Sequence, residues 1–173
     1  AQRGQGPMPP RAGYLYVRRH KARTNLPCAC TPFAFSLDLI SRAVEELASS
    51  LPEGSGFLVS GIGSLAHAQL RLANEANEQH VDGPLEIISV SGSISLEGAH
   101  LHMAVASASG HVIGGHVCRG CEIRTTAELL IAELPGYRLS REHDSATGFK
   151  ELVVHRIGPK DAANLSVNRS ANG

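Results

Sequence analysis

The chain has 173 residues, 42% of them hydrophobic and 18% charged, which is the composition of an ordinary globular domain with its own core. It contains no run of about 18 apolar residues and no charged start followed by an apolar stretch, so we expect no membrane span, no signal peptide and a cytoplasmic location. Aromatic residues make up only 4%, with no Trp, which disfavours a base-stacking platform for single-stranded nucleic acid.

Charge is unevenly distributed, although the formal net charge is zero. No acidic residue precedes Asp38, whereas six basic residues do: Arg3, Arg11, Arg18, Arg19, Lys21 and Arg23. We interpret residues 1–32 as a basic, partly disordered arm with a short strand at 14–17, followed by one domain at 33–157 and a polar tail at 158–173. Such an arm is suited to salt-dependent contacts with DNA phosphates, and a solvated leader segment is the alternative explanation.

The first long element of the domain is a predicted helix that Ser36 caps and that Pro52 and Gly54 end. Its apolar residues follow helical spacing: Ile40, Ala43, Val44, Leu47, Ala48 and Leu51. Residues 57–65 then form a predicted buried strand, whose glycines allow another backbone to come close. Residues 66–72 are the next predicted strand.

Strands follow one another quickly in the rest of the domain. Segments rich in Ile and Val occur at 85–90 and 91–96, and residues 149–154 are predicted to be the closing strand. Residues 124–134 have helix propensity, but their two threonines and their place after several strands favour a strand. Short strands separated by turn residues indicate a mainly antiparallel sheet.

The segment from 99 to 121 holds four of the nine histidines and two of the four cysteines. His100 and His102 alternate with apolar residues, so in a strand their imidazoles share one face. The small, polar turn that follows predicts a hairpin. If Ser109 is the apex of the hairpin, each residue before Ser109 pairs with the residue equally far after it. His102 then lies opposite His116. A slip of one residue would move His116 to the other face of the sheet.

Three imidazoles on two paired strands are the kind of ligand set that holds zinc, or another divalent transition metal, and leaves it an open coordination position. The sequence therefore predicts a metal site at His100, His102 and His116. Ordinary strand histidines that are hydrogen-bonded to their neighbours are the alternative. His111 lies in the turn on the opposite face and is a weaker candidate ligand.

The cysteines offer a separate interpretation. Cys28, Cys30, Cys118 and Cys121 occur as two closely spaced pairs, which is consistent with a reducing compartment and with a four-cysteine zinc site. Cys-x-Cys with Cys-x-x-Cys is a weaker pattern than two Cys-x-x-Cys pairs, and buried free thiols are the alternative. The hairpin register also sets Cys118 opposite His100.

Four motifs together resemble the PPC domain, a family conserved between plants and prokaryotes. They are GPLEIISVSGSIS at 83–95, AHLH at 99–102, GHVIGGH at 110–116 and GCEIRTTAE at 120–128. The resemblance covers residues 33–154. It implies an α/β (α+β) fold, in which flanking helices accompany a mainly antiparallel twisted sheet, assembled as a homotrimer. By the bacterial members of the family it also implies a metal bound through His100, His102 and His116.

Plant members of the family add an AT-hook with an Arg-Gly-Arg-Pro core, of which the nearest candidate here, residues 3–6, lacks the second arginine and the proline. The sheet and histidine site also resemble, more distantly, acetolactate decarboxylase, a zinc enzyme. Two functional hypotheses follow. The first is a trimeric metal-binding module with a DNA-binding or regulatory role through the basic arm.

The second hypothesis is a zinc-dependent enzyme that acts on a small carbonyl or carboxylate compound as ligand of the metal. Zinc held by three neutral imidazoles can polarise a carbonyl or lower the pKa of bound water. Glu128 is then the candidate general acid or base, with Glu86 as a second choice, and Arg124 is a candidate carboxylate clamp. Alternation along the predicted strand sets Arg124 and Glu128 on one face, and a surface ion pair between them is the alternative.

Overall fold

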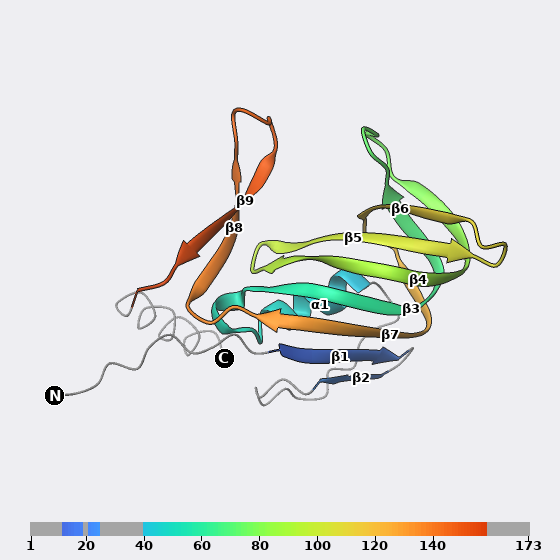
Figure 1. Cartoon of the computed structure of the whole chain (residues 1–173), viewed down its shortest axis with the longest axis horizontal. Coiled ribbons are helices and arrows are strands. Elements are labelled where there is room, and N and C mark those ends of the chain that lie inside the picture. Colours follow the sequence, from blue (N-terminus) through green and yellow to red (C-terminus); the bar gives the residue numbers. More distant parts are fainter. Residues whose placement is uncertain (1–11, 19–20, 25–39, 159–173) are drawn as a thin grey trace.

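The computed structural model describes residues 12–18, 21–24 and 40–158 of the chain (Figure 1). One α-helix, a short 3-10 helix and nine strands lie in the described residues. They are β1 (Ala12–Arg18), β2 (Lys21–Thr24), α1 (Ile40–Ala48), η1 (Pro52–Gly54), β3 (Gly56–Arg71), β4 (Gln79–Ser95), β5 (Gly98–Ser107), β6 (Val112–Val117), β7 (Glu122–Glu133), β8 (Tyr137–His143) and β9 (Lys150–Arg156).

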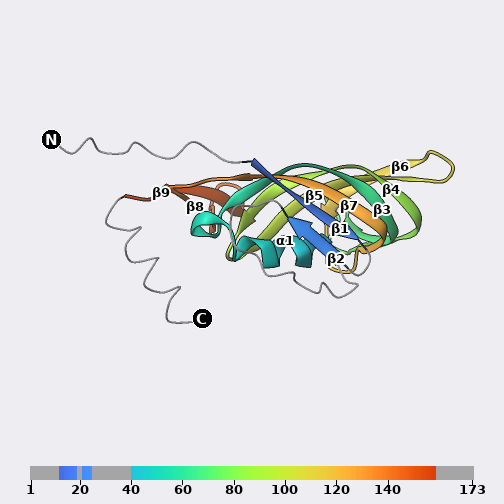
Figure 2. The same ribbon diagram turned by 90° about the horizontal axis from the view of Figure 1, so that it is seen from below.

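Seven strands form one antiparallel sheet in the order β2-β1-β7-β3-β4-β5-β6, and β8 and β9 form a separate hairpin. The end of β3 also pairs with β6, so strands β3 to β6 close on themselves at one end of the sheet. The predicted antiparallel α+β architecture is thereby confirmed. Flanking helices were expected in the plural, whereas the described residues contain one α-helix, which covers one face of the sheet (Figure 2).

The long strands β3 and β4 each unite two segments that the sequence separates. Predicted strands 57–65 and 66–72 both lie in β3, apart from Leu72, and predicted strands 85–90 and 91–96 both lie in β4, apart from Leu96. In β3 the predicted boundary coincides with a shift of register between Leu65 and His67, and in β4 a shift between Ile87 and Ser89 lies just before the predicted boundary. Bulges bend a strand without ending its pairing, which explains why the sequence pattern suggested shorter strands.

The core lies between α1 and the inner face of the sheet. The helical spacing predicted from the sequence is confirmed, because all the apolar positions between Ile40 and Leu51 are buried, while the expected cap Ser36 lies outside the described residues. Sheet residues such as Leu58, Leu101 and Ile131 pack against this face. Burial of these side chains is the main source of stability.

A strand within the predicted basic arm is also confirmed. β1 pairs with β7 along its whole length, and β2 pairs with β1 at the edge of the sheet. Part of the arm is thus built into the sheet. The described part of the chain contains no helix with the length and apolar character needed to cross a membrane.

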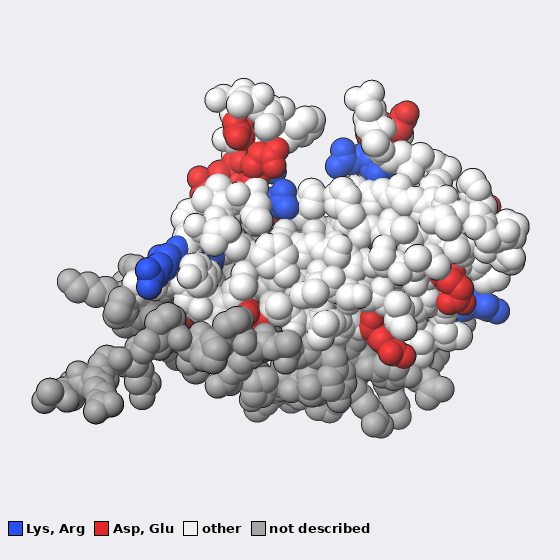
Figure 3. Space-filling view, viewed as in Figure 1, with Lys and Arg blue, Asp and Glu red and all other residues white. Residues whose placement is uncertain are grey.

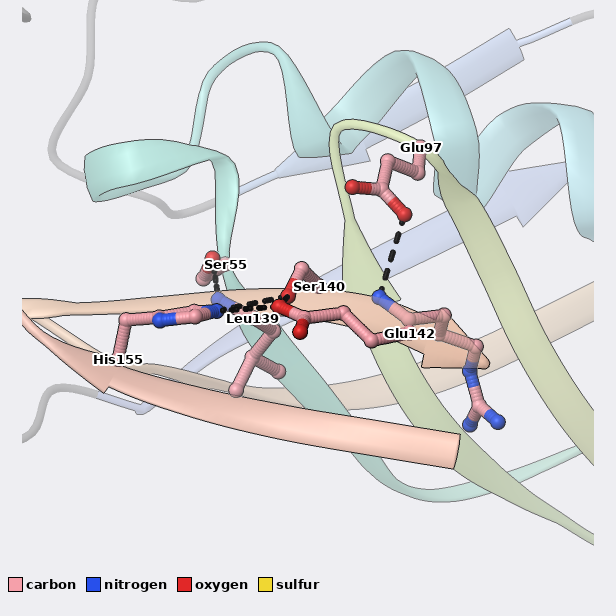
Figure 4. A network of polar contacts seen from close by, with 7 residues as sticks. Ser55, Glu97, Leu139, Ser140, Glu142 and His155 are labelled. Atoms are coloured by element: carbon pink, nitrogen blue, oxygen red, sulfur yellow. Dashed lines mark hydrogen bonds and ion pairs between the residues drawn. The ribbon is translucent and has the colours of Figure 1, made fainter. Parts of the chain in front are cut away.

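The β8–β9 hairpin lies beside the main sheet rather than within it (Figure 1). The predicted closing strand is β9, which pairs with β8 alone, and β8 had no sequence signal that we recognised. Backbone contacts fasten the hairpin to the domain: Leu139 N donates to Ser55 Oγ at 2.8 Å, and Arg141 N donates to Glu97 Oε2 at 3.2 Å (Figure 4).

A side-chain network locks the two strands of this hairpin together. Ser140 Oγ donates to Glu142 Oε1 at 3.0 Å and also lies 2.8 Å from His155 Nε2 (Figure 4). The same His155 nitrogen lies 3.2 Å from Glu142 Oε1. Ser140 is buried. The hairpin is therefore held in a defined position next to the end of the sheet where the histidines lie.

Candidate metal centre

The β5–β6 hairpin has the register that the sequence predicts. His102 pairs directly with His116, and the next residues pair in step up to the turn. Ser107 N donates to His111 O and Gly110 N donates to Ser107 O, both at 2.9 Å, and Gly110 has a φ of 80°. Glycine takes such a conformation without steric cost, so the small polar turn fixes the register without a slip.

Beyond the His102–His116 pair, the chain of β6 no longer pairs with β5. The expected pairing of His100 with Cys118 does not form, because Arg71 and Leu70 of β3 pair with His116 and the residue after it. Cys118 N then donates to the carbonyl of Gln69 in β3 at 2.9 Å. His116 therefore lies where β3, β5 and β6 meet.

The three predicted ligands are brought together at this junction. His100, His102 and His116 each offer a ligand atom, and these atoms all lie within 4.8 Å of one another. The Nε2 atoms of His100 and His102 are 3.2 Å apart. Two nitrogens bound to one tetrahedral zinc lie roughly 3.3 Å apart, given Zn–N bonds of about 2.0–2.1 Å. The spacing of this pair therefore suits a metal.

One nitrogen of the cluster lacks a partner. His116 Nδ1 is the single buried side-chain nitrogen or oxygen without a hydrogen bond among the described residues. A buried polar atom of this kind is normally satisfied, so its isolation is informative. Three imidazoles, one of them with an unpartnered nitrogen, form a donor set that fits zinc or a related divalent ion.

The electrostatic environment keeps two of these imidazoles neutral. Burial lowers the pKa of His100 to about 4, with the positive charge of Arg141 as the next cause. Burial also lowers the pKa of His116, and the charge of Arg71 adds to this effect. A metal binds only the unprotonated nitrogen, so both side chains are prepared for ligation at neutral pH.

Two arginines that the sequence analysis did not single out stand next to the histidines. Arg71 pairs with His116 across β3 and β6, and directly paired residues share a face of the sheet. Ser93 pairs with His100 across β4 and β5, and the Arg141 guanidinium donates to Ser93 Oγ at 3.2 Å. Neither arginine lies near His100, His102 or His116 in sequence, so only long-range pairing reveals them.

The histidines open into a cleft of about 810 Å³ between the β8–β9 hairpin and the end of β3. Figure 3 shows a hollow between the two projecting hairpins, with basic side chains near its base on both sides and acidic side chains on the β8–β9 hairpin. The charged residues that line the cleft are Arg71, Arg141, Lys150 and Glu151. The site is accessible to a small molecule.

The predicted catalytic pair lies elsewhere in the chain. β7 is a strand as predicted, with Arg124 and Glu128 exposed and Leu129 and Ile131 buried. It pairs with β1 and β3, and neither Arg124 nor Glu128 is among the residues that line the cleft. Glu86 does not line it either. Within one chain, the structure does not bring these three residues to the histidines.

The two described cysteines are buried free thiols. Burial raises the pKa of Cys118, and it raises the pKa of Cys121 to about 11. The Cys121 thiol donates to the carbonyl of Gln69 at 3.5 Å, so it is protonated and held by the backbone. Cys28 and Cys30 lie outside the described residues, and a four-cysteine site stays a prediction.

The protein is thus an α+β domain with a curled antiparallel sheet and a cluster of three imidazoles at the closed end of that sheet. A sequence profile of the Plants and Prokaryotes Conserved (PCC) domain matches residues 31–135. The chain therefore belongs to this family, as its motifs predict.

Two curated relatives are both named bifunctional protein GlmU and come from Synechococcus strains JA-2-3B'a(2-13) and JA-3-3Ab. They are 43% and 42% identical to this chain over 118 residues, or 68% of the chain. The match spans only 19% of the length of either relative. It therefore concerns one region of those proteins and leaves most of their length unmatched.

Solved structures share the fold. A hypothetical protein from Salmonella cholerae-suis has a TM-score of 0.67 and 28% identity over 87% of this chain and 99% of its own. A metal-containing protein from Archaeoglobus fulgidus has a TM-score of 0.62 and 22% identity over 83% of this chain and 93% of its own. A candidate DNA-binding protein from Bacteroides thetaiotaomicron has a TM-score of 0.58 and 19% identity over 80% of this chain and 97% of its own.

Proposed function

We propose that this protein is a metal-binding PPC-domain module that holds a divalent transition metal, zinc in the first instance, through His100, His102 and His116. The observation that carries the proposal is the convergence of three imidazoles whose ligand atoms lie within 4.8 Å of one another, and His116 also has a buried Nδ1 without a hydrogen-bond partner. The Archaeoglobus fulgidus protein of similar fold is named as metal-containing, which agrees with this assignment. A zinc ion held by three neutral imidazoles retains its double charge and a position for an oxygen ligand.

Metal content tests the proposal directly. The full chain, purified without added chelator and dialysed, is measured by inductively coupled plasma mass spectrometry. We expect about one zinc per chain, and loss of most of it in His102→Asn or His116→Asn. His111→Asn is the matched control, because that side chain lies exposed in the turn of the same hairpin. Equal zinc in all four proteins would refute the site.

Assembly as a homotrimer is part of the proposal and finds support in an apolar sheet face. Val59, Ile62, Ile88 and Leu130 are 44 to 55% exposed. They lie on strands β3, β4 and β7, and the sheet surface seen from the side opposite α1 carries few charges (Figure 3). Contiguous exposed apolar surface of this kind marks interaction sites in soluble proteins.

DNA is the partner that we propose for the module in a regulatory role. The basic residues before Asp38 supply positive charge, which assembly would multiply, and a neighbour of similar fold is named as a candidate DNA-binding protein. Fluorescence anisotropy with duplex DNA at several salt concentrations tests this. Deleting residues 1–11, which precede β1, removes Arg3 and Arg11 and should weaken binding and flatten its salt dependence. Unchanged binding would refute a role for this segment.

A zinc-dependent enzyme that acts on a small carbonyl or carboxylate compound is the second candidate, favoured by the open cleft beside the imidazoles. Glu128 and Arg124 serve this candidate only if a neighbouring copy of the chain brings its own β7 to the cleft, because within one chain they are absent from its lining. Glu151 is the one carboxylate among the described residues that lines the cleft. If it is the general acid or base, Glu151→Gln should abolish turnover and leave zinc content unchanged.

A further inference from the structure

We propose that the cleft beside the three imidazoles binds a small oxyanion, the carboxylate or phosphate group of a small molecule, through the guanidinium groups of Arg71 and Arg141. This inference rests on the proposed metal centre, because the rest of such a ligand would reach the metal. It assigns a ligand class to the cleft and two residues that select it. The predicted clamp, Arg124, plays no part in it.

The placement of Arg141 is built into the fold. Its backbone N–H donates to Glu97 Oε2, its Nη1 donates to the carbonyl of Lys150 at 3.2 Å, and its Nη2 donates to Ser93 Oγ at 3.2 Å. Ser93 is buried and pairs with His100. A guanidinium carries five N–H donors, so this one is fixed in orientation and still has donors for a ligand.

Arg71 enters the cleft from the opposite wall. It ends β3, where it pairs with His116, and its side chain is exposed. Among the described residues neither arginine forms an ion pair with a carboxylate, whereas Arg119, away from the cleft, pairs with Glu45 of α1 at 3.2 Å. Two cations without anionic partners thus face one concave site.

The charge balance of the cleft favours an anion over a neutral or cationic ligand. Among the described residues, three cations, Arg71, Arg141 and Lys150, and one carboxylate, Glu151, line it, and the charge of Glu78, outside the lining, also acts on His116. A bound divalent metal would make the local potential still more positive. Guanidinium groups recognise carboxylate and phosphate oxygens with paired hydrogen bonds, which gives them preference over neutral isosteres. A cleft of about 810 Å³ accepts a small molecule.

Binding of matched probes tests the proposal. Zinc-loaded full chain is titrated with lactate, with inorganic phosphate and with lactamide, the uncharged counterpart of lactate, and chemical-shift changes in two-dimensional NMR spectra give the dissociation constants. We expect lactate or phosphate to bind and lactamide not to bind. The anion that binds more tightly identifies whether the cleft prefers a carboxylate or a phosphate group. Failure of both anions to bind the wild type would overturn the proposal.

Variants locate the binding groups. Arg71→Gln and Arg141→Gln should each weaken anion binding about tenfold or more. Arg141→Lys keeps the positive charge but loses the forked N–H donors of the guanidinium, so it should weaken binding less. Arg138→Gln is the control, because Arg138 lies exposed on the same strand as Arg141 and outside the cleft lining. The side chain of Arg71 makes no hydrogen bond among the described residues, so its replacement should not disturb folding.

Zinc content, measured in each sample, separates this proposal from the proposed function. If zinc is retained and the two glutamine variants bind anions as the wild type does, the oxyanion assignment is wrong and the metal centre stands. If the wild type holds no zinc, the metal centre fails. The same titration of that zinc-free chain then decides whether the arginines bind oxyanions by themselves. If Arg71→Gln and Arg141→Gln both bind the anion as tightly as the wild type, the oxyanion proposal is refuted.

Discussion

His102 and His116 face each other across the β5–β6 hairpin as directly paired residues, with ring centroids 5.5 Å apart. His100 stacks beside them, 5.2 Å from His102 and 4.7 Å from His116. Facing residues on adjacent strands have Cβ atoms roughly 4.5–5.5 Å apart, which brings their side chains within contact distance. The third imidazole, two residues along one strand, completes a cluster on a rigid scaffold.

Acid should destabilise the metal-free chain. The pKa of His100 falls from 6.5 in the unfolded chain to about 4 in the folded one, and that of His116 is also lowered. Between these pH values the unfolded chain binds more protons, so the free energy of unfolding rises with pH from about 4 to 6.5 and this contribution is constant above that range. Urea unfolding across the range should show a shallower slope for His100→Asn.

The control for this experiment is His111→Asn, which should keep the wild-type slope. A His100→Asn protein with the full pH dependence would show that acid destabilises the chain through other groups. Adding zinc should raise the midpoint of unfolding at neutral pH and lose its effect on acidification, because protons and metal compete for the same nitrogens.

Gly92 should tolerate no larger residue. A Cβ at this position would lie 2.0 Å from the carbonyl oxygen of His100, so the main chains of β4 and β5 come close at the histidine that begins the cluster. We expect Gly92→Ala to destabilise the chain by about 1–3 kcal/mol or more in urea unfolding. Ser91→Ala, at the neighbouring exposed position of the same strand, should be close to neutral. Equal stability of the two variants would contradict this reasoning.

The apolar face of the sheet should hold the proposed homotrimer together. Ile62→Glu or Ile88→Glu places a charge within that surface, and burying an unpaired carboxylate is costly, so sedimentation velocity should detect a shift to monomers. Val154→Glu is the matched control, since Val154 is 55% exposed on the separate hairpin. If the control dissociates the oligomer and the two sheet variants do not, the interface lies elsewhere.

Ser55 should anchor the β8–β9 hairpin. Its buried hydroxyl accepts the N–H of Leu139, and Ser55→Ala leaves that buried donor without a partner. The cost should be about 1–3 kcal/mol in urea unfolding, with faster amide hydrogen exchange in β8 than in β5. Ser109→Ala, in the exposed turn, should change neither measurement. Normal protection of β8 in Ser55→Ala would show that other contacts hold the hairpin.

Much of the candidate metal centre was predictable because it is local in sequence. His100, His102 and His116 belong to one hairpin, and alternation along a strand together with a short turn fixes which side chains share a face. The same reasoning correctly predicted β7 as a strand and the buried face of α1. Local patterns also misled, since bulges within β3 and β4 resemble strand ends in a sequence.

What only the tertiary structure decided depends on contacts between distant segments. The sequence by itself determined the three imidazoles and their register, because period-two alternation and turn chemistry act over a few residues. It did not reveal that β3 returns to His116 with Arg71, nor that the β8–β9 hairpin carries Arg141 to the same cleft. Those placements follow from long-range strand pairing and hairpin docking, which no local pattern encodes. The histidines were therefore predictable, and the ligand class that their cleft selects was not.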